Sequence, residues 1–279
     1  MKAGKGDAPP SDLKPRIVSA LILVAIAALV TWLGGVVFAA SMVALAAVLY
    51  FEWTRMTLLP TQAFSVLWGA GGLFLAGVAI VAFDLGVALW LAAGSAASLV
   101  LVVKSGIAPT ASLTRTKWAI GGMAYALAAT VSLIVIRAAE TDGSDERGLL
   151  LLAFLFLVVW ATDILAYFVG RSVGGPKLMP KVSPKKTISG ALGGLAGAML
   201  VGALLAPFLP EFGAATAVLL ALVLSIVSQI GDLFESWIKR RYAVKDSSNL
   251  IPGHGGFMDR VDGLVFAAVP LALYIAATG

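Results

Sequence analysis

The feature that most constrains this chain is a series of apolar runs, each long enough to cross a membrane as a helix. A spanning helix takes about 20 apolar residues, and the mean hydropathy of +0.97 lies far outside the range of soluble domains. We count nine runs in the 279 residues, near 17–33, 36–51, 63–83, 86–103, 117–136, 148–170, 189–209, 214–238 and 262–277. The sequence therefore predicts an all-α, polytopic membrane protein with about nine transmembrane helices.

The start of the chain, residues 1–16, is polar and is expected to form a flexible cytoplasmic arm. A signal peptide is the alternative, because a basic segment precedes an apolar run. The run at 17–33 is longer than the usual signal-peptide core and another follows at once, which favours a retained first helix. The first two helices could form one hairpin hinged at Gly34 and Gly35. Beyond the arm we expect two groups of membrane helices, about five at 17–137 and about four catalytic ones at 148–279.

The basic residues predict how the helices are oriented. If the N-terminus is cytoplasmic, 18 of the 20 Lys and Arg lie on the cytoplasmic side, and only Arg137 and Arg147 lie on the other. Cytoplasmic loops of membrane proteins carry such an excess of Lys and Arg. We therefore expect the N-terminus and the active-site loops in the cytoplasm, the C-terminus on the opposite side, and a bacterial inner membrane as the location.

Two carboxylates are expected inside the membrane at one depth. Asp163 lies eight residues before Arg171, and Asp232 lies seven before Lys239. At about 1.5 Å per residue, each is on the order of 12 Å below the cytoplasmic end of its helix. Ionisable side chains at such depth are costly unless they are paired, hydrated or metal-bound, so they are functional candidates. A structural network, in which a carboxylate pairs with a basic side chain, is the alternative.

Helical spacing groups further polar residues with these carboxylates. Positions i, i+4, i+7 and i+11 share one face of a helix. In the eighth run these positions hold Ser228, Asp232, Glu235 and Lys239. A similar stripe in the sixth run consists of Asp163, Tyr167 and Arg171. Both patterns predict helix faces that are polar from mid-membrane to the surface.

Asp259 and Asp262 stand three residues apart where the ninth run begins. Acidic residues in a first helical turn interact favourably with the helix dipole, so capping is the alternative. A hard cation such as Mg²⁺ takes a few carboxylates, keeps its waters and adds phosphate oxygens of a substrate. We therefore predict a Mg²⁺ site, with room for a second cation. The expected ligands are Asp232 and Asp259, assisted by Asp262 or Asp163.

Two glycine-containing segments predict phosphate binding. In Pro252–Gly256 the glycines let backbone N–H groups approach a phosphate closely. His254 in this turn could polarise a phosphate oxygen, contact a nucleotide base or only fix the turn. The segment from Gly170 to Thr187 adds four lysines and several hydroxyl groups, and its alternative is a solvated basic loop.

These motifs resemble the phosphatidate cytidylyltransferase family, also called CDP-diacylglycerol synthase. The family signature ends in Pro-Gly-His-Gly-Gly-x-x-Asp-Arg-x-Asp, and this chain resembles it over residues 236–262. The matching residues are Ser236, Lys239, Arg240, Lys245, Asp246, Pro252, Gly253, His254, Gly255, Gly256, Asp259, Arg260 and Asp262. The Asp163–Lys186 segment is also similar, although Ser189 stands where the family commonly has Glu. The first five helices resemble the family only in hydropathy.

The resemblance implies transfer of a cytidylyl group from CTP to phosphatidic acid, with Mg²⁺, at the cytoplasmic side of a membrane. The residues expected to act in catalysis are Asp232, Lys239, Arg240, Lys245, Asp246, His254, Asp259 and Arg260. Those expected to bind substrate phosphates are Ser183, Lys185, Lys186, Thr187, Ser236, Gly255 and Gly256. The expected partners are CTP, phosphatidic acid and the bilayer, with no nucleic acid; the sequence leaves a homodimer open.

Two other functions remain as alternatives. An ion or solute transporter would also carry buried carboxylates, but these would be spread through the membrane rather than gathered near one face. A CTP-dependent polyprenol kinase, or a cytidylyltransferase acting on ether lipids, would differ only at the site of the acceptor.

Overall fold

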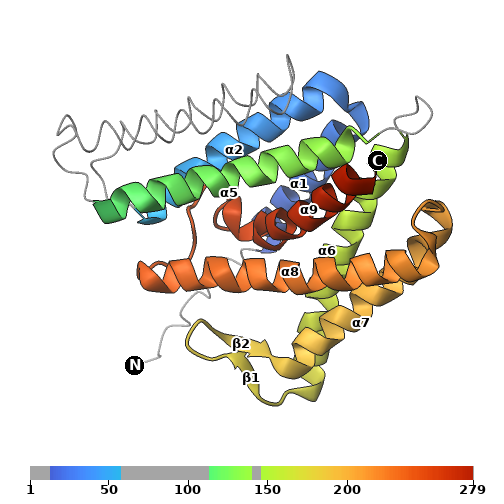
Figure 1. The fold of residues 1–279 in the computed structure, drawn as a ribbon. Helices are drawn as coiled ribbons and strands as arrows, with labels where there is room; N and C mark the ends of the chain where they lie inside the picture. The colour runs from blue at the N-terminus through green and yellow to red at the C-terminus, as the bar shows by residue number, and fades with distance from the viewer. Residues whose placement is uncertain (1–12, 58–112, 140–145, 279) are drawn as a thin grey trace, which may run out of the picture.

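The computed structural model describes residues 13–57, 113–139 and 146–278, and these form a mostly helical structure (Figure 1). Its α-helices are α1 (Leu13–Leu33), α2 (Gly35–Thr57), α5 (Leu113–Arg137), α6 (Glu146–Val173), α7 (Ile188–Leu205), α8 (Gly213–Arg241) and α9 (Met258–Thr278). A short 3-10 helix, η1 (Ala206–Phe208), links α7 to α8. Six of the described helices are long and apolar enough to cross a membrane, and α1 adds a shorter apolar stretch at Ile17–Leu33.

Seven of the nine predicted helices therefore have a counterpart in the described part of the chain. The two predicted near 63–83 and 86–103 lie outside the described residues, so the total of nine stays a prediction. The predicted arm at 1–16 lies mostly outside them as well, although α1 already begins at Leu13.

The predicted hinge between the first two helices is confirmed. Gly34 separates α1 from α2 with a φ of +60°, and Gly35 follows with a φ of +48°. Side chains disfavour this left-handed region. At Gly34 there is also no room for one, because a Cβ atom would collide with the guanidinium group of Arg137. Arg137 Nε donates a hydrogen bond of 2.8 Å to the carbonyl oxygen of Thr31, so α5 holds this hairpin in place.

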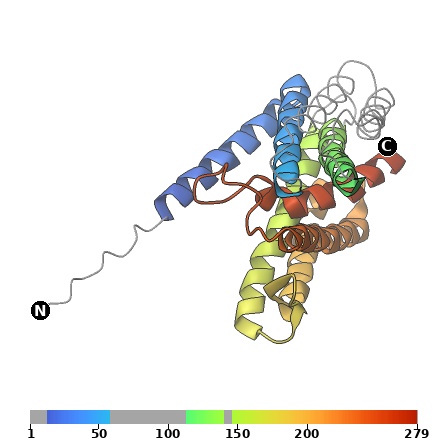
Figure 2. The ribbon, with the colours of Figure 1, turned by 90° about the vertical axis from the view of Figure 1, so that its left-hand side faces the viewer.

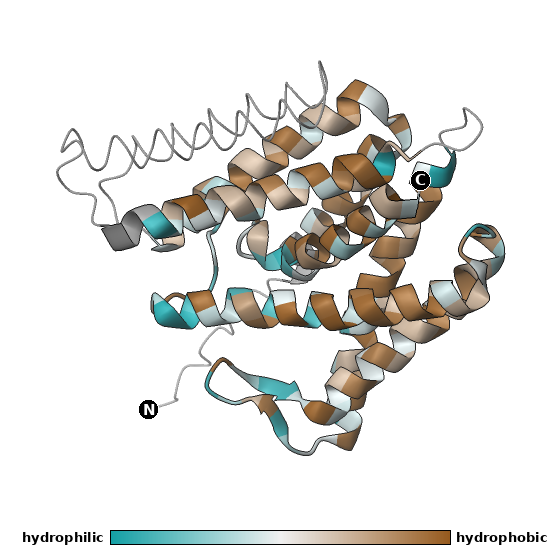
Figure 3. Ribbon diagram, in the orientation of Figure 1, coloured by the Kyte–Doolittle hydropathy of each residue, from teal (hydrophilic) through white to brown (hydrophobic). Residues whose placement is uncertain are grey.

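The predicted all-α class is confirmed in part, because the described residues are mostly helical, but one segment forms strands. The basic stretch after α6 forms an antiparallel hairpin of β1 (Lys177–Met179) and β2 (Ser183–Thr187). Thr187 then caps α7, because its Oγ1 accepts a hydrogen bond of 3.1 Å from the N–H of Gly190. Figure 3 shows hydrophilic residues in this hairpin and at the C-terminal end of α8, whereas the helices are mainly hydrophobic.

The C-terminal helices pack closely on one another. α6 packs along α7, and α7 and α9 both pack against α8, while α2 lies along α5 and α5 lies against α9. Glycines on α7 permit the close approach to α6: a Cβ atom at Gly194 would lie 2.9 Å from the carbonyl oxygen of Thr162. Small residues at this point thus allow close packing of the two helices. This packing brings α8, α9 and the hairpin together.

Candidate active site

One part of the site lies where the polar face of α8 meets the start of α9. Lys239 Nζ is 3.3 Å from Glu235 Oε1 and 2.8 Å from Asp259 Oδ1. All three side chains are largely buried, with exposed fractions of 14% for Lys239, 1% for Glu235 and 7% for Asp259. Two acidic side chains from different helices thus form ion pairs with one buried lysine.

Asp259 also organises the loop between α8 and α9. Its Oδ2 accepts hydrogen bonds from the N–H groups of Gly256, at 2.9 Å, and Ser247, at 3.0 Å. Gly255 has a φ of +88°, and a Cβ atom there would lie 2.9 Å from Asp259 Oδ2. The glycines predicted to admit a phosphate therefore admit a carboxylate of the protein itself, and phosphate binding by Gly255 and Gly256 stays a prediction.

A second part of the site joins the hairpin to α8. Lys186 on β2 forms an ion pair with Asp232, and Ser236 Oγ donates to Asp232 Oδ1 at 3.4 Å. Arg240 Nε reaches across to the carbonyl oxygen of Val182 at 3.3 Å. The basic segment after α6 thus forms a wall that faces α8.

The remaining acidic residues adjoin these two ion pairs. Asp163 on α6 lies near enough to Asp232, Asp262 and Lys186 for their charges to interact. Asp262 Oδ1 accepts a hydrogen bond of 2.8 Å from the N–H of Gly263. We call the five acidic residues the carboxylate cluster: Asp163, Asp232, Glu235, Asp259 and Asp262. Asp163, predicted to lie at the depth of Asp232, is thus near enough to interact with it electrostatically.

The donor chemistry of the carboxylate cluster fits a hard cation. Glu235 is buried, its Oε1 lies 3.3 Å from Lys239 Nζ, and Asp259 and Asp262 are its acidic neighbours. Burying such charges together is costly without a compensating cation. Among the described residues, no group of three or more His, Asp or Glu is arranged as a ready-made metal site. The ammonium groups of Lys186 and Lys239 supply positive charge beside the carboxylate cluster.

Several predicted site residues have other surroundings. His254 Nδ1 lies 2.8 Å from Ser19 Oγ on α1, and Arg260 donates to the carbonyl oxygen of His254. Figure 2 shows the loop between α8 and α9 lying beside α1. These contacts favour the interpretation in which His254 fixes the turn. Lys185, Lys245 and Asp246 are exposed.

Glu52 on α2 is a further site residue that the sequence interpretation missed. Its side chain is fully buried, with an exposed fraction of 0%. It accepts hydrogen bonds from the hydroxyls of Ser247 and Ser248, at 3.0 and 2.5 Å, and from the N–H groups of Phe257 and Met258, at 2.9 and 2.7 Å. An acidic residue directly after an apolar run was the available signal. Glu52 positions the loop that carries the signature.

The chain resembles known proteins along almost its whole length. The model of a group described as the Cytidylyltransferase family matches residues 14–278. The chain belongs to this cytidylyltransferase family. The resemblance predicted from residues 236–262 is thereby confirmed, and the match extends the family likeness to the N-terminal helices, including the one with Glu52.

Individual relatives of this cytidylyltransferase carry a more specific name. A phosphatidate cytidylyltransferase from Brucella abortus biovar 1 (strain 9-941) is 44% identical over 267 residues, which cover 95% of this chain and 93% of the relative. The protein of that name from Bacillus subtilis (strain 168) is 34% identical over 139 residues, 50% of this chain and 51% of its own. One from Synechocystis sp. is 37% identical over 127 residues, 46% of this chain and 43% of its own.

Proposed function

We propose that this chain is a phosphatidate cytidylyltransferase, which transfers CMP from CTP to phosphatidic acid in phospholipid biosynthesis. The observation that carries the proposal is the 44% identity to a relative of that name over nearly the full length of both chains. The carboxylate cluster and its two lysines support it, because charged side chains at the end of apolar helices suit a reaction between a nucleotide and a membrane lipid.

In this reaction a phosphate oxygen of the lipid attacks the α-phosphorus of CTP in line. A P–O bond forms to the α-phosphorus while the bond from the α-phosphorus to the bridging oxygen breaks, and pyrophosphate leaves with the electron pair. The lipid phosphate is already ionised at neutral pH, so little general-base help is needed. The protein then contributes mainly by positioning the reactants and neutralising their charge.

The lysines are placed to change partners when substrates bind. Lys186 pairs with Asp232, and Lys239 pairs with Glu235 and Asp259. Phosphate oxygens would compete for these ammonium groups, which bind phosphate as point charges, and Arg240 and Arg260 can add bidentate contacts. The signature lysines and arginines are thus proposed to hold the triphosphate and the lipid phosphate.

Mg²⁺ is the proposed cofactor, held by Asp232 and Asp259 with Asp262 and Asp163, and a second cation is part of the proposal. When bound, such a cation neutralises charge on the substrate phosphates. Glu235 is the acidic residue that the structure adds to this set.

The proposed setting is a bacterial inner membrane, with the N-terminus and the site on the cytoplasmic side. The predicted distribution of Lys and Arg supports this orientation. The six apolar helices support insertion in a bilayer. A homodimer remains part of the proposal.

Purified protein incubated with labelled CTP, Mg²⁺ and phosphatidic acid tests the proposal. We expect CDP-diacylglycerol and pyrophosphate in equal amounts, and no lipid product when phosphatidic acid is omitted. Absence of a CDP-lipid would overturn the proposal. A phosphorylated product from a polyprenol, or preference for an ether-linked acceptor, would instead assign the chain to one of the alternative enzymes.

A further inference from the structure

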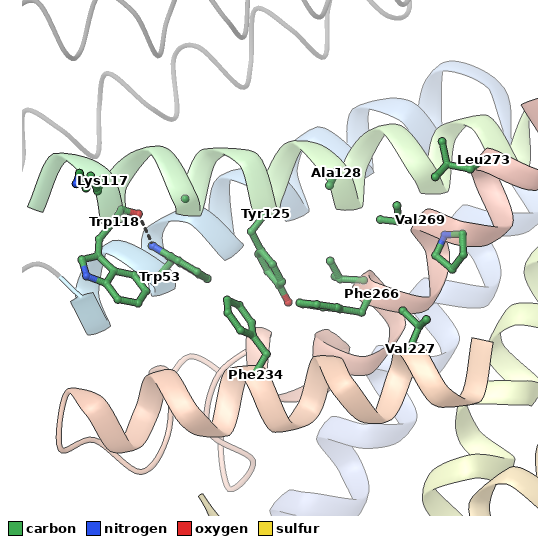
Figure 4. Close-up of a pocket in the computed structure, with 13 residues that line it drawn as sticks. Trp53, Lys117, Trp118, Tyr125, Ala128, Val227, Phe234, Phe266, Val269 and Leu273 are labelled. Carbon is green, nitrogen blue, oxygen red and sulfur yellow. Dashed lines mark hydrogen bonds between the residues drawn. The ribbon is translucent and has the colours of Figure 1, made fainter. Parts of the chain in front are cut away.

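An apolar groove of about 750 Å³ lies between α5 and α8 (Figure 4). Both of these helices pack against α9, which also contributes lining residues. Trp53 on α2 stacks on Tyr125 with ring centroids 5.5 Å apart, and Phe234 lies close by on α8. The groove therefore has an aromatic section, followed along α8 and α9 by aliphatic side chains. The aliphatic lining residues are Ala128, Val227, Val265, Val269 and Leu273.

The two ends of the groove differ in charge. Lys117 lines one end, and the guanidinium group of Arg241 lies 5.9 Å from the centre of the Trp118 ring, which lines the same end. Val269 and Leu273 line the other end. Basic and aromatic residues beside an apolar channel complement a molecule with an anionic head and an apolar tail. The charge pattern therefore favours a phospholipid whose polar part points toward the Lys117 side of the groove and whose acyl chain points toward Leu273.

Tyr125 connects the groove to the carboxylate cluster. It lines the groove, its side chain is 9% exposed, and its hydroxyl has no hydrogen-bond partner within the described residues. The charged groups that act on this hydroxyl are Glu235, Asp262 and Glu52. A buried hydroxyl without a partner is unfavourable, and a ligand oxygen could accept a hydrogen bond from it. One ligand could thus contact both the groove and the site of chemistry.

We propose that the groove holds an acyl chain of the lipid substrate, and that the Tyr125 hydroxyl donates a hydrogen bond to an ester oxygen of that lipid. This inference rests on the proposed function. The lipid phosphate lies at the carboxylate cluster, and the chain extends past Tyr125 along Val227, Val269 and Leu273. The groove then selects acceptors by the length of their chains.

A pair of neighbouring substitutions tests this placement. Val227 lines the groove, whereas Ile226 is 42% exposed and is not among its lining residues. Val227→Trp adds bulk inside the groove, and Ile226→Trp adds the same side chain outside it. We expect Val227→Trp to lower kcat/KM for dioleoyl phosphatidic acid by about tenfold or more. The same variant should keep its activity on dihexanoyl phosphatidic acid, and Ile226→Trp should keep both activities.

Three outcomes of this experiment overturn the proposal. Val227→Trp could leave the long-chain activity unchanged, or lower both activities equally, which would indicate an effect on the fold or on the headgroup. It could also change the number of subunits measured by native mass spectrometry, which would assign the groove to a second copy of the chain.

Photolabelling provides a measurement that does not depend on turnover. Phosphatidic acid with a diazirine in one acyl chain is added to the unmodified protein in phosphatidylcholine nanodiscs and illuminated. We expect label in the groove-lining parts of three helices, residues 121–128 of α5, 227–234 of α8 and 265–273 of α9, and competition by unlabelled phosphatidic acid. Label elsewhere, or equal competition by phosphatidylglycerol, overturns the proposal.

The two proposals can fail separately. If the protein makes no CDP-lipid but the groove is labelled specifically by phosphatidic acid, the proposed reaction fails and the lipid site stands. If the protein makes CDP-lipid and the label falls outside the groove, the reaction stands and the inference about the groove fails.

Discussion

The acidic residues of the site occur in two kinds of surroundings in this protein. In the carboxylate cluster, Asp232 and Asp259 are balanced by lysines, which a phosphate could attract away. Glu52 is instead surrounded by two hydroxyls and two backbone N–H groups. These donors lie in the loop between α8 and α9 and at the start of α9, and the Glu52 carboxylate is the acceptor that stabilises them. The difference separates carboxylates suited to exchanging partners during a reaction from one suited to holding structure.

The sharpest test of this comparison is Asp232→Asn. The substitution preserves size and an oxygen that Ser236 can reach, but it removes the charge that pairs with Lys186. We expect formation of CDP-lipid to fall by a factor on the order of 10³ or more, while the melting temperature in detergent stays unchanged. Retained turnover would contradict the proposed role of Asp232.

Unlike Asp232→Asn, Glu52→Gln should lower the stability of the protein. A glutamine amide offers one acceptor oxygen and two donors, so at least one donor of the loop loses its partner. We expect the free energy of unfolding to fall by about 1–3 kcal/mol, with a loss of turnover that follows from the displaced loop. Glu146→Gln is the matched control, because Glu146 is exposed at the start of α6. Equal melting temperatures for the two variants would contradict the positioning role.

Lys186→Met tests whether the lysine paired with Asp232 binds the substrate or stabilises the fold. The Lys186 and Asp232 side chains are each 30% exposed, so their ion pair should add little stability. We expect the KM for CTP or phosphatidic acid to rise by about tenfold, with almost no change in melting temperature. Lys181→Met, at an exposed position of the same hairpin segment, serves as the control. A lower melting temperature without a kinetic effect would indicate a structural pair.

The smallest expected effect belongs to Ser248→Ala. It removes one hydrogen bond to Glu52 and should lower the free energy of unfolding by about 0.5–1.5 kcal/mol. The double variant with Glu52→Gln should lose less free energy of unfolding than the two single variants together, because both substitutions affect one hydrogen-bond network. Additive losses, measured by thermal or denaturant unfolding, would show that Ser248 and Glu52 act independently.

Much of the polar geometry could be predicted from local spacing. The stripe of α8 that begins at Ser228 does present Asp232, Glu235 and Lys239, at i+4, i+7 and i+11, toward their partners, because helical periodicity alone determines which side chains share a face. The glycine hinge at Gly34 also follows from local chemistry, since a left-handed residue between two apolar runs favours glycine.

The rest depends on contacts between distant segments. Glu52 lies 195 residues before Ser247, and no periodicity in either segment indicates that they meet. The hairpin was predicted as a loop because Ser183–Thr187 lacks the alternation of apolar and polar residues that marks a strand. The groove is harder still to predict, because it results from the angles at which α5 and α8 pack on α9.

The contacts of Glu52 also bear on how the protein can be divided. The part of the chain from α6 onward contains every residue of the signature, and it would look like an independent catalytic module. A fragment that starts at α6 would nevertheless leave the Phe257 and Met258 N–H groups without their acceptor. We therefore expect such a fragment to regain an ordered signature loop only when a separately expressed N-terminal part is supplied in the same membrane.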